Sequence, residues 1–205
     1  MTGRMGSMVV VLALAALWGV APCPAAHARS TVAAAAPQDR TGMALRHQLG
    51  GRSYQLAAVH PEPAAGRILQ EYLPPGQVLG QQTEMLMIDL VQGRHDPVQA
   101  AQRKLQEILA RREQGDMLAN GELLLGPGGS AAVDFVLSAT LPGGGLVVEW
   151  NAYHYRQLDG ALVLTGLSRR AYGDEAVTAF LTGLKERRGP DRNALLAWQP
   201  ELSRP

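Results

Sequence analysis

The chain contains a single cysteine, Cys23, among its 205 residues. One thiol excludes an internal disulfide framework. Aromatic residues are also scarce, at 5% of the chain, and no HExxH zinc motif or Walker phosphate-binding sequence occurs. We therefore assign no catalytic residue, no metal ligand and no cofactor from the sequence.

One long apolar run lies near the start of the chain, at residues 9–21, after the cationic Arg4 and before Ala26-His27-Ala28. This layout is typical of a secretory signal peptide. The run is shorter than the roughly 20 residues that span a bilayer as a helix. We therefore predict a signal peptide at residues 1–28, cleavage after Ala28, a periplasmic or secreted protein, and no membrane span after cleavage.

The chain also has almost no excess of positive over negative charge. The formal net charge is +1, and removal of residues 1–28 takes away Arg4 and no acidic residue, which leaves a neutral chain. A dedicated nucleic-acid-binding domain normally has a pI above about 9, so we expect no nucleic-acid partner. Cleavage also removes Cys23, unless this residue is kept as the acylated start of a lipoprotein, an alternative that Pro22 disfavours.

Residues 29–52 are rich in Ala, Pro and Gly without a lasting period, which predicts a flexible leader. Residues 53–205 predict one domain, long enough to bury its own core. Its pattern predicts strands at residues 53–59, 67–72, 84–91, 118–125, 130–141, 146–158 and 161–172, a helix at 97–115 after the Asp96-Pro97 cap, a second helix from 174 that stops at Gly189-Pro190, and a short third helix at 191–199.

These elements predict an α+β fold, with a single antiparallel sheet of about six or seven strands and two main helices packed mainly on one face. A two-residue turn at Asp159-Gly160 places Trp150 opposite Arg169 and Glu149 opposite Arg170. A four-residue loop at 142–145 places Leu137 opposite Trp150. The apolar face would then hold Val133, Phe135, Leu137, Ala139, Val148, Trp150, Ala152, Val163 and Leu167.

The reverse face of this predicted sheet collects polar and aromatic side chains. One interpretation is a solvated face, as antiparallel sheets often have. The other is a binding surface, because tyrosines beside a Glu/Arg pair offer stacking area and hydrogen bonds. The candidate binding residues are Asp134, Glu149, Asn151, Tyr153, Tyr155, Ser168 and Arg170.

Three further patterns suggest chemistry but have simpler explanations. Asp134 and Glu149 on one face would suit acid–base catalysis, yet Arg170 beside Glu149 favours an ion pair. His154 is expected to be a packed, hydrogen-bonded core histidine. Methionines at 85, 87 and 117 suggest a soft copper site, but buried methionines usually fill gaps in a core.

The segments Glu71–Gln77 and Thr83–Leu86 resemble small uncharacterised secreted proteins of proteobacteria, a likeness that implies no activity. The order of the elements is similar to the PsbP/Mog1-like group in topology alone, and fold analogy does not transfer function. We expect an exported, non-enzymatic binding or accessory protein whose partner is another envelope protein or a small ligand. The alternatives are a hydrolase-like enzyme that uses Asp134 or Glu149, and an immunity or inhibitor protein for an exported toxin.

Overall fold

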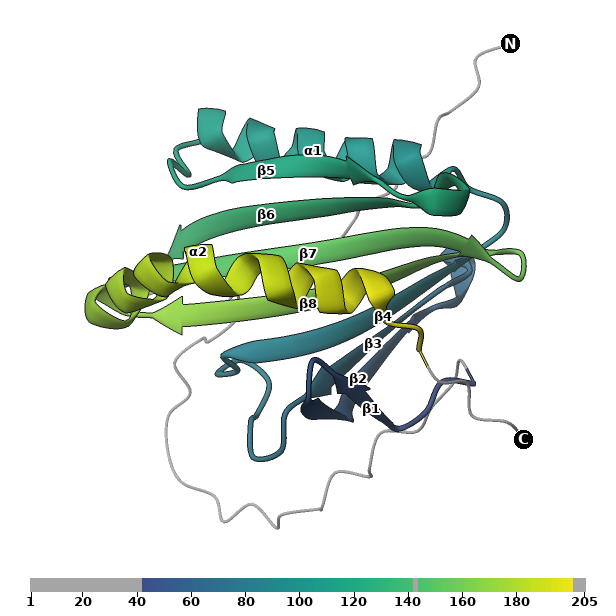
Figure 1. Cartoon of the computed structure of the whole chain (residues 1–205), viewed down its shortest axis with the longest axis horizontal. Helices are drawn as coiled ribbons and strands as arrows, with labels where there is room; N and C mark the ends of the chain where they lie inside the picture. Colours follow the sequence, from purple (N-terminus) through teal and green to yellow (C-terminus); the bar gives the residue numbers. More distant parts are fainter. Residues whose placement is uncertain (1–41, 142–143, 201–205) are drawn as a thin grey trace, which may run out of the picture. The chain divides into compact units, whose positions relative to one another are not determined.

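A single antiparallel sheet forms the framework of the described part of the chain (Figure 1). The computed structural model describes residues 42–141 and 144–200, which belong to one unit spanning Ala35–Pro205. Eight strands follow the order β1-β2-β3-β4-β8-β7-β6-β5 across the sheet. The predicted signal peptide at residues 1–28 and most of the predicted leader lie outside the described residues.

The strands are β1 (Arg46–Leu49), β2 (Arg52–Glu62), β3 (Arg67–Leu73), β4 (Glu84–Gln92), β5 (Asn120–Leu125), β6 (Ala131–Thr140), β7 (Leu146–Leu158) and β8 (Ala161–Tyr172), and the helices are α1 (Pro97–Glu113) and α2 (Asp174–Ala197). The prediction of six or seven strands is therefore wrong. The additional strand, β1, lies within residues 29–52, where the sequence predicted a leader. Only two of its four residues, His47 and Leu49, are buried. Two apolar-face positions are too few for the alternation of a strand to be recognised in the sequence.

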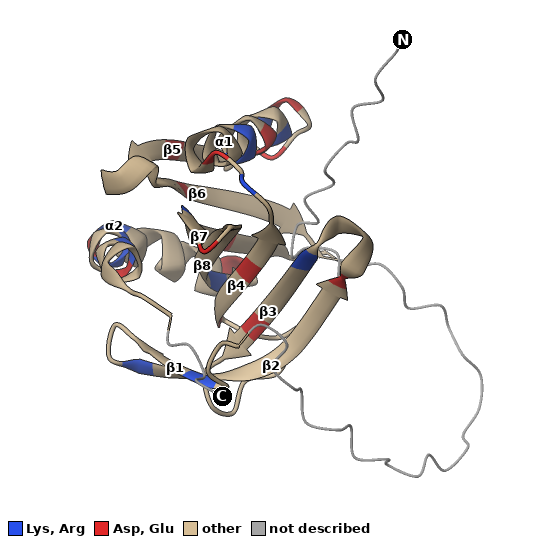
Figure 2. Ribbon diagram, turned by 90° about the vertical axis from the view of Figure 1, so that its right-hand side faces the viewer, with Lys and Arg blue, Asp and Glu red and all other residues tan. Residues whose placement is uncertain are grey.

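The two helices pack on opposite faces of the sheet, which corrects the prediction that both lie mainly on one face. Val177, Phe180 and Leu184 of α2 join the core cluster around Trp150 of β7. Leu105 of α1 instead reaches the space beside Gly121 of β5, together with Phe135 of β6. Figure 2 shows the two helices on different sides of the strands.

The core on the α2 side is built around Trp150, which is fully buried. It belongs to one core cluster with Val148 of β7, Leu167 of β8 and Leu86 of β4. Burial of an indole removes about 200 Å² from water and stabilises the fold by several kcal/mol. This cluster fixes the position of α2 against β7 and β8.

Helix α2 continues through Pro190, so the predicted stop at Gly189-Pro190 and the separate helix at 191–199 are wrong. Proline removes one backbone donor from a helix interior. The turns after Pro190 are nevertheless held by tertiary contacts, because Leu195 is fully buried in the core and Asp191 forms an ion pair with Arg169. Packing thus overrides the local stop signal.

Candidate functional site

The register of β7 and β8 is the one that the sequence predicted. Trp150 lies opposite Arg169, and Glu149 lies opposite Arg170. Glu149 and Arg170 form an ion pair. The two residues of the turn between these strands, Asp159 and Gly160, have φ angles of 44° and 79°. The predicted turn type requires a positive φ at both positions.

The register of β6 differs from the prediction by one residue. Val136, not Leu137, lies opposite Trp150, and Asp134 lies opposite Ala152. The connection between β6 and β7 spans residues 141–145, one residue more than the predicted loop. Because side chains alternate along a strand, this shift moves every β6 side chain to the other face. Asp134 and Glu149 therefore do not share a face.

The remaining residues of the predicted polar face do share one side of the sheet: Glu149, Asn151, Tyr153, Tyr155, Ser168 and Arg170. This side is packed, not open. Asn151 is fully buried, and Tyr155 and Ser168 are also buried. The ring of Tyr153 meets Phe135 edge-on at 4.9 Å between centroids. The shift in β6 explains the packing, since it delivers Phe135, Val133 and Leu137 to this face beneath α1.

Asp134 anchors α2 on the opposite face. Its carboxylate accepts hydrogen bonds from the indole Nε1 of Trp150 at 2.7 Å and from Arg188 at 2.8 Å and Arg192 at 3.0 Å. Glu122 pairs with the same two arginines. A cavity of about 440 Å³ beside α2 includes Arg188 and Arg192 in its wall, but both cations are already neutralised there.

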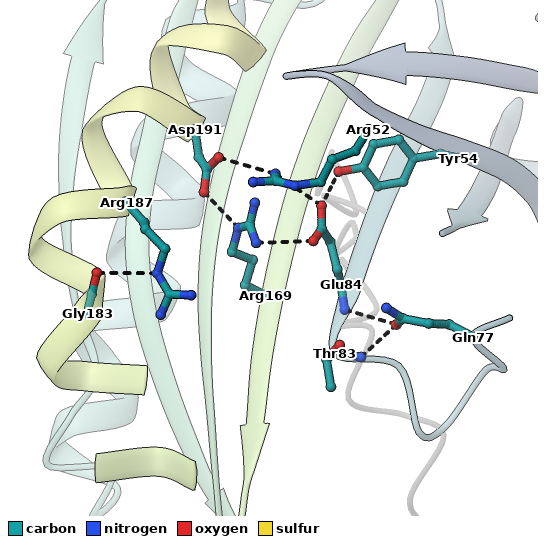
Figure 3. A network of polar contacts seen from close by, with 9 residues as sticks. All are labelled: Arg52, Tyr54, Gln77, Thr83, Glu84, Arg169, Gly183, Arg187 and Asp191. Atoms are coloured by element: carbon teal, nitrogen blue, oxygen red, sulfur yellow. Dashed lines mark hydrogen bonds and ion pairs between the residues drawn. The ribbon is translucent and has the colours of Figure 1, made fainter. Parts of the chain in front are cut away.

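A second polar network joins α2 to β2, β4 and β8 (Figure 3). Glu84 contacts Arg52 at 3.4 Å and Arg169 at 3.1 Å, and it accepts a hydrogen bond from the hydroxyl of Tyr54. Asp191 pairs with the same two arginines at 3.4 and 2.7 Å. Two carboxylates and two guanidinium groups thus balance each other, which is the arrangement of a structural anchor.

A second cavity lies where the β5–β6 connection, the end of β7 and the C-terminal end of α2 meet. The β5–β6 connection and the end of β7 are toward the right of Figure 1. We call it the end pocket. Its volume is about 340 Å³, and its wall consists of Leu124, Leu125, Gly126, Pro127, Gly128, Ser130, Ala131, Ala132, His154, Arg156, Gln157, Leu158, Leu196 and Gln199. Small-molecule sites usually measure about 300–1,000 Å³, so the end pocket has the size of a small-ligand site.

Arg156 is the unusual residue of the end pocket. Its Nε and one terminal nitrogen, Nη2, are buried without a hydrogen-bond partner. Burial lowers the pKa of its guanidinium, and no carboxylate offsets this effect. In Arg170, by contrast, burial also lowers the pKa, but Glu149 and Tyr172 together raise it above its ordinary value. A partly buried charge without a counter-ion costs free energy and marks a place where an anion would be stabilised.

His154 lies next to Arg156 in the same wall. Burial, together with the positive charge of Arg156, lowers the pKa of His154 to about 4, so the imidazole is neutral at pH 7. Its Nδ1 has no hydrogen-bond partner, nor has the buried hydroxyl of Thr165, which lies opposite it. The sequence correctly indicated a packed histidine, although Nδ1 makes no hydrogen bond.

Arg156 was not among the candidate residues predicted from the sequence, although the pattern of β7 contains a signal for it. Every second side chain of β7 lies on the same face of the sheet. The predicted core face therefore contains Arg156 as well as Trp150, Ala152 and His154. An arginine at the end of an apolar face requires a partner or an opening to solvent. The cavity itself forms where the β5–β6 connection lies near the last turn of α2. These segments are far apart in the sequence, so no local sequence pattern predicts that they are close in the fold.

Within the described residues, no group of three or more His, Cys, Asp or Glu side chains is arranged to hold a metal ion. Met85 and Met87, two of the three methionines considered for copper, are buried in β4, and the third, Met117, is exposed. None of the helices in this part of the chain is long and apolar enough to cross a membrane.

A protein-family model matches residues 47–198, which begins in β1 and ends just after α2. No curated protein matches the chain. The matched segment contains the whole end pocket apart from Gln199.

Proposed function

This chain belongs to an uncharacterised bacterial protein family, and we propose that it is an exported, non-enzymatic binding protein that holds a small anionic ligand in the end pocket. The predicted signal peptide at residues 1–28 supports export. The single observation that carries the binding role is Arg156, whose buried nitrogens lack a partner in a cavity of ligand size.

An anion in the end pocket would satisfy both Arg156 and its neighbours. A carboxylate, sulfonate or phosphate oxygen accepts charge-assisted hydrogen bonds from a guanidinium, the strong class of such bonds. Neutral His154 adds a polar group without adding charge. The rest of the wall is mostly Leu, Ala, Gly and Pro, so the ligand also gains apolar contact.

The alternative of a hydrolase-like enzyme finds less support. Asp134 is occupied by Trp150 and two arginines, and Glu149 is paired with Arg170. The two carboxylates lie on opposite faces, so they cannot act on one substrate as acid and base. The part of the end pocket that the described residues form contains no carboxylate.

The fluorescent anion 1-anilinonaphthalene-8-sulfonate provides a test, because it combines one sulfonate with an apolar body. We expect the wild-type protein to bind it and Arg156→Gln to bind it at least about tenfold more weakly, since a hydrogen bond to a charged group contributes about 1.5–3 kcal/mol. Arg187→Gln is the matched control, because Arg187 is exposed on α2 and its Nε donates to Gly183 of the same helix. Equal binding by wild type and Arg156→Gln would contradict the proposal.

A further inference from the structure

Resting on the proposed function, we infer that the ligand of the end pocket is an amphiphilic monocarboxylate, that is, a carboxylate at the end of an aliphatic chain. Three properties of the wall, as residues 124–199 form it, lead to this class: its single positive charge, its leucine-rich surface, and the absence of aromatic side chains.

The charge of the pocket selects a monoanion. Among the described residues of the wall, Arg156 is the one lysine or arginine, and no Asp or Glu is present. His154 contributes no charge at pH 7. A dianionic phosphomonoester would keep one negative charge uncompensated in a partly buried site, which costs free energy. A carboxylate matches the guanidinium in charge and offers two oxygens to its planar edge.

The wall indicates what the rest of the ligand is. Leu124 and Leu196 line the cavity, and Leu125 and Leu158 lie exposed at it, with 72% and 40% of their surface open to solvent. Exposed leucines that continue an apolar cavity to the surface suit a chain that extends outward. Bases and sugar rings often stack on aromatic side chains, and none lies among the described residues of the wall.

The test compares four competitors for the bound fluorescent anion at pH 8: sodium octanoate, sodium acetate, 1-octanol and octyl phosphate. We expect octanoate to compete at least tenfold more tightly than each of the other three. Leu125→Gln should weaken the affinity for octanoate severalfold and leave the affinity for acetate unchanged, because this exposed position would contact only the aliphatic chain of the ligand. Arg156→Lys should retain part of the octanoate affinity, since it keeps the charge and loses the fork of donors.

The outcomes separate the inference from the proposed function. Octyl phosphate as tight as octanoate would overturn the assigned head group. If acetate bound as tightly as octanoate, the ligand would not need an aliphatic chain, and this part of the inference would be wrong. If 1-octanol bound as tightly as octanoate, the ligand would not need a negative charge. If no competitor displaces a reporter whose binding still requires Arg156, this inference fails while the proposed function stands. If reporter binding does not require Arg156, both fail. Thermal melting of each variant checks that it is folded.

Discussion

At the residue scale, Arg156 combines a cost to the fold with a use in binding. Its buried nitrogens have no partner, whereas Arg67, another partly buried arginine, reaches Asp89 at 2.8 Å. Unpaired donors in a ligand-free site lower the free energy of unfolding, and a binding function is a reason to keep them. The same residue therefore supports a prediction about stability and one about affinity.

The stability prediction concerns Arg156→Leu. We expect this variant to unfold with a free energy about 1 kcal/mol higher than wild type, because it removes unpaired donors from a leucine-rich wall. Urea unfolding measures the difference. Arg187→Leu, on the exposed side of α2, should stay within about 0.5 kcal/mol of wild type. A loss of stability in Arg156→Leu would show that the guanidinium already has a stabilising role.

His154 supports a prediction about pH. Its pKa is about 4 in the folded chain, below the ordinary value of 6.5, so the unfolded chain binds a proton first as the pH falls. Its contribution is complete above about pH 6.5 and is lost progressively down to about pH 4. At pH 5 the loss is on the order of 1–2 kcal/mol. Urea unfolding at pH 7.5 and 5.0 should show a smaller pH effect in His154→Gln; an unchanged effect would argue against a buried neutral imidazole.

At the element scale, helix α2 is held at two polar anchors in addition to its apolar face. One is Asp134 with Trp150, Arg188 and Arg192; the other is Asp191 with Arg52 and Arg169. Both lie on the face that Trp150 occupies. The second anchor follows Pro190 and holds the final turns of the helix, which contribute Leu196 to the end pocket.

Removal of the second anchor tests this role. Asp191→Ala should lower the free energy of unfolding by about 3 kcal/mol, because it leaves the largely buried Arg169 without one of its two partners. Amide hydrogen exchange should then accelerate most in the last turns of α2. Glu186→Ala, an exposed position on the same helix, is the matched control and should be close to neutral. Uniform exchange rates along α2 in both variants would contradict a local anchor.

Comparison of sequence and structure is most instructive for β6. The turn at Asp159-Gly160 was predictable because a two-residue hairpin leaves little choice of geometry, and the β7–β8 register followed from it. The loop at 141–145 has no such constraint, and one extra residue reversed the face of Asp134 and Phe135. The same error made a packed layer look like an open polar face. Burial beneath α1 depends on tertiary packing, which strand periodicity does not report.

At the scale of the whole molecule, export remains the prediction on which the biological setting depends. The sequence motif Ala26-His27-Ala28 predicts a mature chain that begins at Arg29. Intact mass measurement of the protein from the periplasm or medium should give the mass of residues 29–205. A mass that retains Cys23 with acyl chains would instead establish a lipoprotein.

The most direct test of the central claim, that the end pocket binds an anion through Arg156, is the nuclear magnetic resonance signal of the Arg156 Nε–H group. In the free protein this donor has no partner. On titration with octanoate or with 1-anilinonaphthalene-8-sulfonate, the signal should shift in a saturable manner, while that of the exposed Arg187 stays in place. An Arg156 signal that does not move at saturating concentrations of either anion would contradict the account.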